Sequence, residues 1–231
     1  MEENLRRIEE EIAEACYRAG RAREEVALLA VTKTVAPGRI NEAIRLGVAR
    51  IGENRVQEYL GKKEALQLTG VETHLIGHLQ TNKVSKIVGQ VDMIQSVDSL
   101  HVAHAVDQAS LRLHRVTDVL MEVNIGGEEA KSGVASDQTS ELVAALGEMK
   151  GLRVRGPMTI PPISDTEKQK RDYFCRMQKL FIDIRDKKID NVCMDILSMG
   201  MSSDYREAIM EGSTMVRIGT ALFGKRAPAA R

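Results

Sequence analysis

The amino-acid sequence predicts an α/β fold, a single (β/α)8 TIM barrel, and three observations lead to this prediction. Strand-like and helix-like patterns alternate along almost the whole chain, which is typical of a parallel sheet with crossover helices. The strand-like segments number eight, the count that closes into a barrel. The length of 231 residues is close to the roughly 250 of a typical barrel of this kind.

The expected strands are short apolar runs, which cover residues 26–32, 49–52, 73–76, 92–96, 118–123, 152–158, 194–198 and 215–218. An open, doubly wound sheet is the alternative arrangement of such strands. No Gly-x-Gly-x-x-Gly motif follows the first strand to favour it. No linker or low-complexity tract interrupts the pattern, so we expect residues 1–231 to form one domain.

The helical patterns lie between the strands, with one extra helix before the first strand. Leu5, Ile8 and Ile12 give this N-terminal helix an apolar stripe, and Gly20 ends it. The sequence stops soon after the last strand, which leaves little room for an eighth outer helix. We therefore expect the N-terminal helix to fill that place in the outer ring.

Two later helices have clear start signals in the sequence. Pro37 opens one that stops at Gly47. Ser164 and Glu167 form a capping-box pattern in front of another, which carries apolar residues as far as Ile184.

Composition excludes several classes of function. Hydrophobic residues make up 43% of the chain but aromatic residues only 3%, so the core must be aliphatic and rich in Met. Lys plus Arg number 33 and Asp plus Glu number 33, so no net charge attracts nucleic acid or an anionic membrane. No apolar run approaches the roughly 18 residues needed to span a membrane.

The cysteines and the N-terminus indicate the cytoplasm. Cys16, Cys175 and Cys193 are odd in number and scattered, which is typical of reduced thiols. The start Met-Glu-Glu-Asn followed by an amphipathic helix is not a signal peptide.

Chemistry in a barrel is found where the strands end, so the strand-ending residues are the candidates for a site. They are Lys33, Glu53, Asn54, Gly77, His78, Ser96, Asn124, Met158, Thr159, residues 198–202 and residues 217–220. Lys33 is the most informative, because a lysine desolvated at the end of a buried strand can act as a neutral nucleophile toward an aldehyde. A solvated lysine at the start of a loop is the plain alternative.

The segments after the seventh and eighth expected strands resemble a phosphate cradle. Ser202 and Ser203 open a short helix, and Gly219 and Thr220 follow the last strand. Backbone amides and hydroxyls at such places bind phosphate dianions, and these loops are the usual phosphate site of the fold. The serines and Asp204 are also ordinary helix N-caps, and Arg217 also fits a buried ion pair.

The chain resembles the pyridoxal phosphate homeostasis protein family, a single-domain relative of the N-terminal barrel of alanine racemase. The resemblance runs almost end to end. It is carried by the motifs Ala30-Val-Thr-Lys33, Gly52-Glu-Asn54, His74-Leu-Ile-Gly77-His78-Leu-Gln80-Thr-Asn82-Lys83, Ser198-Met-Gly-Met-Ser202 and Met215-Val-Arg217-Ile-Gly219-Thr220. It implies a fold-type-III-like barrel that binds pyridoxal 5′-phosphate (PLP).

The resemblance also implies a role for each of six cofactor-binding residues. Lys33 would form the internal aldimine, and Asn54 would lie near the cofactor ring. Arg217 would face the pyridine nitrogen. Ser202, Gly219 and Thr220 would hold the phosphate. The family usually has Trp at the position of Thr73, which begins the third strand at the end away from the expected site, so this departure concerns local packing.

Three further groups of residues have less certain roles. His78 ends the third strand, where it acts either as an acid or base or as a hydrogen-bonded structural residue. Lys131 lies on a polar loop, where it either reaches the mouth as a second amine or is solvated. The remaining histidines show no grouping typical of a metal site, so we expect no metal.

Arg217 argues against strong catalysis. A strong electron sink needs a protonated pyridine nitrogen, and a guanidinium, which stays charged, cannot accept that proton. Racemisation also needs a second base. In alanine racemase this base is a tyrosine from a second domain, whereas all four tyrosines here fall in helical patterns. We therefore expect a protein without catalytic residues that carries or buffers PLP and maintains vitamin B6 homeostasis.

Two enzymatic hypotheses remain as alternatives to this carrier. One is a PLP-dependent amino-acid racemase or a related aldimine enzyme. The other is a class I aldolase-type barrel that uses Lys33 on a sugar phosphate, which the match to the family disfavours. The expected partners are PLP itself, apo-forms of PLP enzymes and free amino acids, with no nucleic acid and no membrane.

Overall fold

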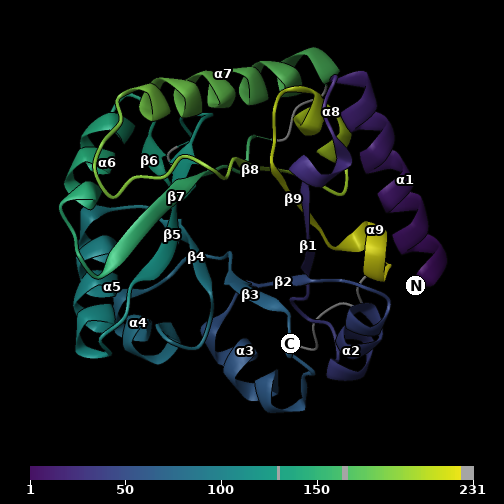
Figure 1. Cartoon of the computed structure of the whole chain (residues 1–231), viewed down its shortest axis with the longest axis horizontal. Coiled ribbons are helices and arrows are strands. Elements are labelled where there is room, and N and C mark those ends of the chain that lie inside the picture. Colours follow the sequence, from purple (N-terminus) through teal and green to yellow (C-terminus); the bar gives the residue numbers. More distant parts are fainter. Residues whose placement is uncertain (129–130, 163–165, 225–231) are drawn as a thin grey trace.

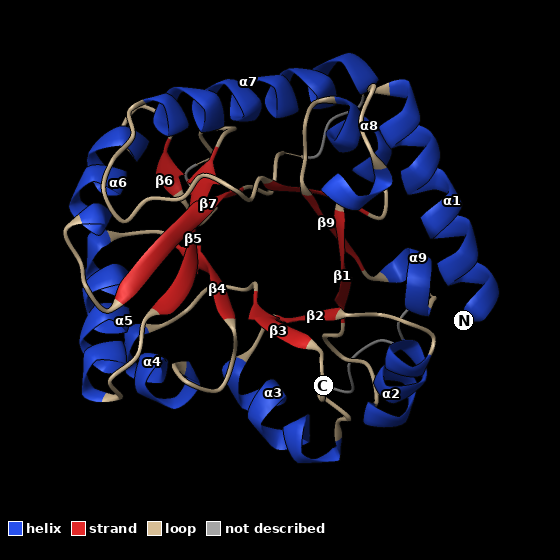
Figure 2. Cartoon of the chain, viewed as in Figure 1, coloured by secondary structure: helices blue, strands red, loops and turns tan. Residues whose placement is uncertain are grey.

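The computed structural model describes residues 1–128, 131–162 and 166–224 and shows a closed parallel barrel inside a ring of helices (Figure 1, Figure 2). Its strands are β1 (Ala27–Val31), β2 (Arg50–Glu53), β3 (Glu72–Leu75), β4 (Met93–Val97), β5 (Thr117–Asn124), β6 (Val134–Ala135), β7 (Leu152–Met158), β8 (Ser198–Met201) and β9 (Met215–Ile218). The order around the sheet is β4-β3-β2-β1-β9-β8-β7-β5, and the pairing of β4 with β5 closes it. The two-residue β6 pairs with β5 outside this circle. The predicted eight-stranded barrel is confirmed.

The helices cover the outside of the barrel (Figure 2). They are α1 (Glu2–Arg18), α2 (Pro37–Arg45), α3 (Val56–Lys62), α4 (Thr81–Ile87), α5 (Leu100–Arg112), α6 (Thr139–Gly147), α7 (Glu167–Asp186), α8 (Tyr205–Met210) and α9 (Thr220–Phe223), with 3-10 turns at Arg23–Glu25 and Lys63–Ala65. No helix in this described part of the chain is both long and apolar enough to cross a bilayer.

The N-terminal helix takes the expected place in the outer ring. Ile8 and Ile12 are fully buried and belong to one apolar cluster with Ile209 of α8 and Leu222 of α9. The side-chain amide of Asn4 donates to the carbonyl of Leu222 over 3.1 Å. Figure 1 shows α1 lying beside these short C-terminal helices. The helix therefore covers the seam where the two ends of the barrel meet.

The barrel interior is narrow and tightly packed. Leu29, Val31 and Met215 form one small apolar cluster there. On the neighbouring strand β2, a Cβ at Gly52 would lie 2.3 Å from Cδ2 of Leu29, so any larger residue there would force the side chain of Leu29 to move. A larger apolar cluster, which includes Phe174, packs between the strands and the outer helices from α3 to α8. Each large side chain buried in this way contributes on the order of 1.5–3 kcal/mol to folding.

The largest difference from the expected strand boundaries is at β8. The strand expected at residues 194–198 is β8, at Ser198–Met201. Just before it, the backbone amides of Asp195 and Ile196 both donate to the carbonyl of Arg155, an irregular pairing that a regular strand cannot make. The capping box at Ser164 lies outside the described residues. The hydroxyl of Thr166 accepts a hydrogen bond from the amide of Gln169 at the start of α7.

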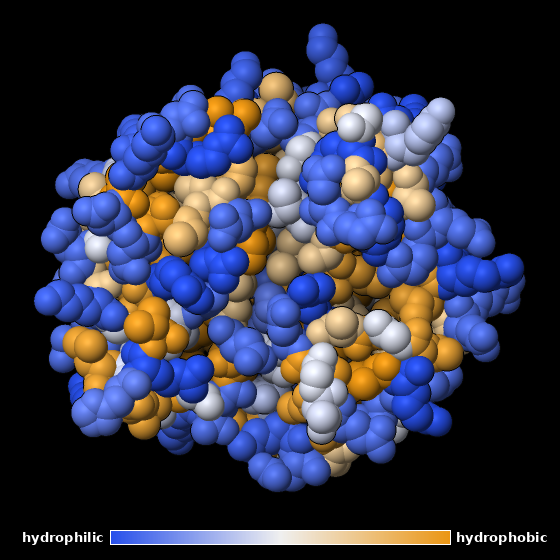
Figure 3. Space-filling view, viewed as in Figure 1, coloured by the Kyte–Doolittle hydropathy of each residue, from blue (hydrophilic) through white to orange (hydrophobic). Residues whose placement is uncertain are grey.

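The face of the molecule in Figure 3 is largely hydrophilic around its rim, with hydrophobic side chains gathered in patches between the polar ones. This agrees with a chain in which 29% of the residues are charged and the signs balance. Because polar side chains cover the outer helices, the two ends of the barrel are the places where a binding site is expected.

Candidate functional site

Lys33 follows β1 at the carboxyl end of the barrel, which we call the mouth. Leu29 and Val31 point into the barrel, and the alternation of an extended strand places Lys33 on the same side. The amide of Thr32 still pairs with the carbonyl of Gly52 over 2.9 Å, so the strand geometry continues past the last β1 residue. Thr34 then adopts a left-handed φ of 59° and turns the chain. The lysine is half-buried at this turn, as a nucleophilic amine requires.

Asn54 follows β2, beside Lys33, and is held by a close contact between two strand ends. A Cβ on Gly77 would lie 2.4 Å from the carbonyl oxygen of Asn54 and 2.9 Å from its Cα. Only glycine at position 77 allows the end of β3 to approach Asn54 so closely. The half-buried Asn54 is therefore fixed at the mouth by backbone packing.

Arg217 lies on β9 in the barrel interior, with only 3% of its surface exposed. One guanidinium nitrogen donates to the hydroxyl of Ser198 over 2.7 Å, and the other donates to the carbonyl of Thr159 over 2.7 Å. Burial lowers the pKa of Arg217 to about 10, which still leaves it charged at neutral pH. The charge of Glu122 opposes this shift. The guanidinium is thus a fixed cation.

A chain of buried hydrogen bonds continues from Arg217 through the barrel. The hydroxyl of Ser198 donates to the side-chain oxygen of Gln95 over 2.8 Å, and the side-chain amide of Gln95 lies 2.7 Å from Nδ1 of His74. His74 in turn lies 3.5 Å from the carboxylate of Glu72. Because the amide of Gln95 is a donor, Nδ1 must accept and His74 carries its proton on Nε2. These contacts fix the orientation of Arg217.

The loops after β8 and β9 converge on one hydroxyl. Oγ of Ser202 accepts hydrogen bonds from the amides of Gly219 at 3.3 Å and Ala221 at 3.2 Å. Thr220 is exposed between them at the start of α9. Asp204 instead folds back and accepts from the amide of Met201 over 2.6 Å, so it stabilises its own turn. Hydroxyls and amides from two neighbouring loops form a donor set suited to a phosphate dianion.

Two strand-ending candidates turn away from the mouth. Glu53 is fully buried and pairs with the amine of Lys62 on α3 over 2.5 Å, outside the barrel. The side chain of Asn124 closes the following loop, where its amide donates to the carbonyl of Glu128 over 2.8 Å and its oxygen accepts from the amide of the same residue. Both side chains have structural roles in stabilising the segments that they join.

Glu122 and Gln95 were missed because only strand ends were considered. Glu122 lies two residues before the end of β5, and Gln95 lies in the middle of β4. The alternation of inward-facing and outward-facing side chains along each strand is the sequence signal that indicates them. Leu120 belongs to an interior cluster, so Glu122 shares its inward face.

His78 and Lys131 are both paired. Nδ1 of His78 lies 3.1 Å from a carboxylate oxygen of Asp98. The amine of Lys131 donates to the carbonyl of Pro161 over 3.2 Å and forms an ion pair with Glu128. Within residues 1–128, 131–162 and 166–224, no group of three His, Cys, Asp or Glu side chains is placed to hold a metal ion.

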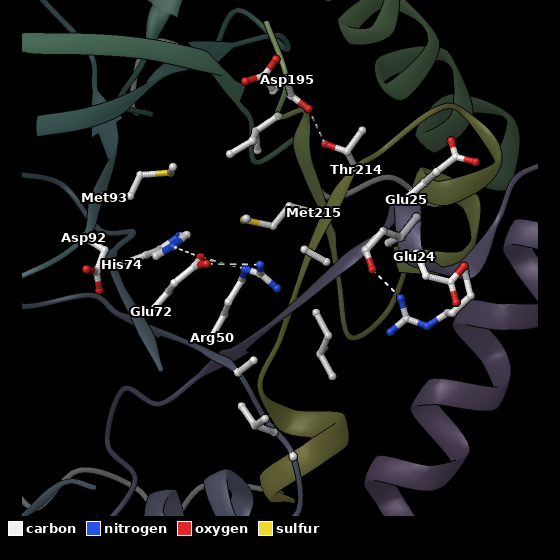
Figure 4. A pocket seen from close by; sticks show the side chains of 18 of the residues that line it. Glu24, Glu25, Arg50, Glu72, His74, Asp92, Met93, Asp195, Thr214 and Met215 are labelled. Carbon is white, nitrogen blue, oxygen red and sulfur yellow. Dashed lines mark hydrogen bonds and ion pairs between the residues drawn. The ribbon is translucent and has the colours of Figure 1, made fainter. Parts of the chain in front are cut away.

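A cavity of about 890 Å³ lies at the opposite end of the barrel (Figure 4). Most of the charged side chains that line this cavity pair with one another. Arg50 and Glu72 form an ion pair at 2.8 Å, and Arg155 lies 2.7 Å from Asp118. His74 points into it and links it to the hydrogen-bond chain described above. In barrels of this type the amino ends of the strands serve stability, so we place the site at the mouth.

Comparison with known proteins agrees with this geometry. The family model for the alanine racemase N-terminal domain matches residues 4–227. The pyridoxal phosphate homeostasis protein of Aquifex aeolicus is 44% identical over 224 residues, which cover 97% of each chain. The structure of PipY from Synechococcus elongatus with PLP bound has a TM-score of 0.81 and 32% identity, covering 92% of this chain and 100% of that one.

A more distant likeness shows the fold alone. Alanine racemase of Clostridium difficile superimposes with a TM-score of 0.78 at 15% identity, and the match covers 98% of this chain but 58% of the racemase. The barrel is therefore the part that the two proteins share. The match of the family model over residues 4–227 and the full-length relatives show that the chain belongs to the pyridoxal phosphate homeostasis protein family, within the alanine racemase N-terminal domain family.

Proposed function

We propose that the chain binds PLP at the mouth of the barrel and carries or buffers it in vitamin B6 homeostasis. One observation supports this above all: an amine, a buried guanidinium and a set of phosphate donors lie on the neighbouring strands β1, β9 and β8. PLP carries an aldehyde, a ring nitrogen and a phosphate, and these three groups match the three kinds of residue.

Each residue has one task in this proposal. Lys33 attaches the aldehyde through its amine, and Asn54 lies beside the ring. Arg217, held by Ser198 and Thr159, faces the ring nitrogen. Ser202 and Thr220 supply hydroxyls to the phosphate. Gly219 supplies its backbone amide, which donates to Oγ of Ser202 in this structure and would turn to the phosphate on binding.

The same residues explain why a carrier is favoured over a catalyst. Bound PLP supplies an aldehyde for amine exchange and a ring that withdraws electrons from a substrate carbon. Arg217 cannot accept a proton while it is charged, so it keeps the ring nitrogen unprotonated and the electron sink weak. Tyr59 and Tyr205 are committed to other partners, the carbonyl of Gln90 and the carboxylate of Glu11. Tyr17 and Tyr173 lie on the outer helices α1 and α7, so no tyrosine among the described residues supplies a second base at the mouth.

The wider setting of this function is also proposed. We infer that apo-forms of PLP enzymes receive the cofactor and that free amino acids react with it, because an amine-exchangeable aldehyde suits both exchanges. We place the protein in the cytoplasm, since Cys16, Cys175 and Cys193 are free thiols. We take residues 1–231 as one domain, which the family match over residues 4–227 supports.

Borohydride labelling tests the linkage. The purified protein incubated with PLP should be yellow, and borohydride should fix one pyridoxyl group on Lys33, located by peptide mass spectrometry. Lys33→Ala should lose the yellow absorbance, while Lys83→Ala serves as the matched control and should keep it. A label on Lys83 or Lys131 would show that Lys33 is not the attachment site.

A second measurement separates carrier from racemase. The PLP-loaded protein is incubated with single-enantiomer amino acids, and the appearance of the other enantiomer is followed by chiral chromatography. We expect a rate close to that of free PLP, because the electron sink is weak and the second base is missing. Turnover far above free PLP would reject the carrier proposal in favour of the racemase.

A further inference from the structure

Glu122 is a buried carboxyl at the mouth, and one of its oxygen atoms lacks a hydrogen-bond partner among the described residues. It lies near the end of β5 on the inward face of the strand, and 9% of its surface is exposed. Its Oε2 atom is buried and has no hydrogen-bond partner among the described residues. A buried oxygen left without a partner costs on the order of 1–3 kcal/mol, so such an atom calls for a ligand.

The charges around Glu122 come from three other strands. Asp98 follows β4, His78 follows β3, and Arg217 lies on β9. Burial is the main cause that raises the pKa of Glu122 to about 7, and the charge of Asp98 adds to it. Arg217 and His78 act in the opposite direction. At neutral pH the carboxyl is therefore present in substantial part as the neutral acid, which can donate a hydrogen bond.

The order of the strands places Glu122 on the far side of the mouth from the anchoring residues. Around the closed barrel, β5 is the fourth strand from β1 in both directions, so it lies opposite Lys33. The phosphate donors lie on the loops after β8 and β9. In PLP the phosphate arm and the phenol oxygen are attached on opposite sides of the aldehyde-bearing carbon. A ring held by Lys33 and by the loops after β8 and β9 would therefore direct its phenol edge away from the phosphate donors, toward the β2–β5 half of the barrel.

We propose that Glu122 meets the phenol oxygen of PLP as a neutral acid and donates a hydrogen bond to it. This proposal rests on the proposed function. An ionised carboxylate cannot fill the role, because the phenol oxygen of bound PLP carries negative charge and two anions at hydrogen-bonding distance repel each other. Glu122 would thus make the affinity for PLP depend on proton binding at the mouth.

The test compares wild type with Glu122→Gln, whose amide has the same shape and donates at every pH. Dissociation constants for PLP are measured by equilibrium dialysis between pH 6 and 8.5. The ratio of wild-type to variant dissociation constants should rise from about one at pH 6 to roughly tenfold at pH 8.5, where Glu122 is mostly ionised. Taking the ratio removes the titration of Lys33 and of the phosphate, which both proteins share.

Two controls define the outcome. With 3-deoxypyridoxal 5′-phosphate, which lacks the phenol oxygen, the ratio should stay flat over the whole pH range. Glu53→Gln is the matched variant, because Glu53 is also buried with an unpartnered oxygen but faces Lys62. The ratio of the wild-type to the Glu53→Gln dissociation constant should not change with pH. In wild type alone, replacing PLP by the 3-deoxy compound should weaken binding more at pH 6 than at pH 8.5.

A ratio for Glu122→Gln that is flat with PLP would overturn the proposal, as would a rise that persists with the 3-deoxy compound. Either result leaves the proposed function intact, since PLP still binds. If wild type fails to bind PLP at every pH, the proposed function itself fails. If the variant does not fold, the wild-type comparison of the two ligands decides the question alone.

Discussion

At the residue scale, Glu122 makes the stability of the ligand-free protein depend on pH. Its pKa is raised to about 7 in the folded protein, above the ordinary value of a glutamate, so the folded state holds this proton more tightly than the unfolded state. Below about pH 4.3, the pKa of Glu122 in the unfolded chain, the contribution of this proton to the free energy of unfolding is fully present. This contribution is lost as the pH rises toward 7. We expect Glu122→Gln to be more stable than wild type at pH 8, by at most about 4 kcal/mol, with no such advantage at pH 4.

Urea denaturation at the two pH values measures this difference, with Glu64→Gln, an exposed acid, as the control. An equal change in stability at both pH values would mean that the carboxyl ionises normally in the folded state.

Gln95 is the central residue of the buried hydrogen-bond chain. Its replacement by leucine leaves Nδ1 of His74 and the hydroxyl of Ser198 without this partner in an apolar surrounding. We expect Gln95→Leu to lower the free energy of unfolding by roughly 2–4 kcal/mol and to weaken PLP binding, because Arg217 loses the support of Ser198. The exposed Gln108→Leu is the control. Unchanged stability together with unchanged affinity would show that the chain is not needed to orient Arg217.

At the scale of elements, the phosphate donors act as a pair of loops. Ser202 bridges from the end of β8 to the amides that follow β9. Each charge-assisted hydrogen bond to the dianion contributes roughly 1.5–3 kcal/mol. We expect the double variant Ser202→Ala, Thr220→Ala to bind PLP at least about tenfold more weakly, with little change for unphosphorylated pyridoxal. Dialysis with both ligands measures this, and equal losses for the two would mean that the residues only support the fold.

The ends of β2 and β3 are coupled by Gly77. A methyl group at this position would overlap the backbone of Asn54, which cannot move aside as a flexible side chain can. We expect Gly77→Ala to shift the end of β2 and to lower both the melting temperature and the affinity for PLP. Gly61→Ala, where an added Cβ meets nothing within 4 Å, is the control. Calorimetry and dialysis on both variants measure the effect; a Gly77→Ala protein indistinguishable from the control would refute it.

At the scale of the whole molecule, the barrel was predictable because its signals are repetitive. Eight short apolar runs alternating with amphipathic helices allow few other folds, and the apolar stripe of the N-terminal helix indicates that it packs on the barrel. The position of β8 was not predictable. The residues before it are mostly apolar, like those of a strand. The amides of Asp195 and Ile196, however, both donate to the carbonyl of Arg155 on β7, so this segment does not pair as a regular strand.

The candidate site was predictable only in part, because pattern reasoning finds strand ends but not the directions of side chains. Lys33, Arg217 and Ser202 lie where strand ends predict them. Glu53 does not face the mouth, because pairing with Lys62 draws it outward. The importance of Glu122 depends on burial and on charges from three other strands, and no local sequence pattern encodes either of these.

The pairing of β1 with β9 has a consequence for synthesis in the cell. Lys33 emerges from the ribosome early, whereas Arg217 and the donors after β9 are translated near the end of the chain. A nascent chain therefore presents the reactive amine long before the guanidinium and the cradle exist. Because the contacts that close the barrel join segments so far apart in sequence, they form late. In the proposed function, specific capture of PLP therefore requires that β1 and β9 have already paired.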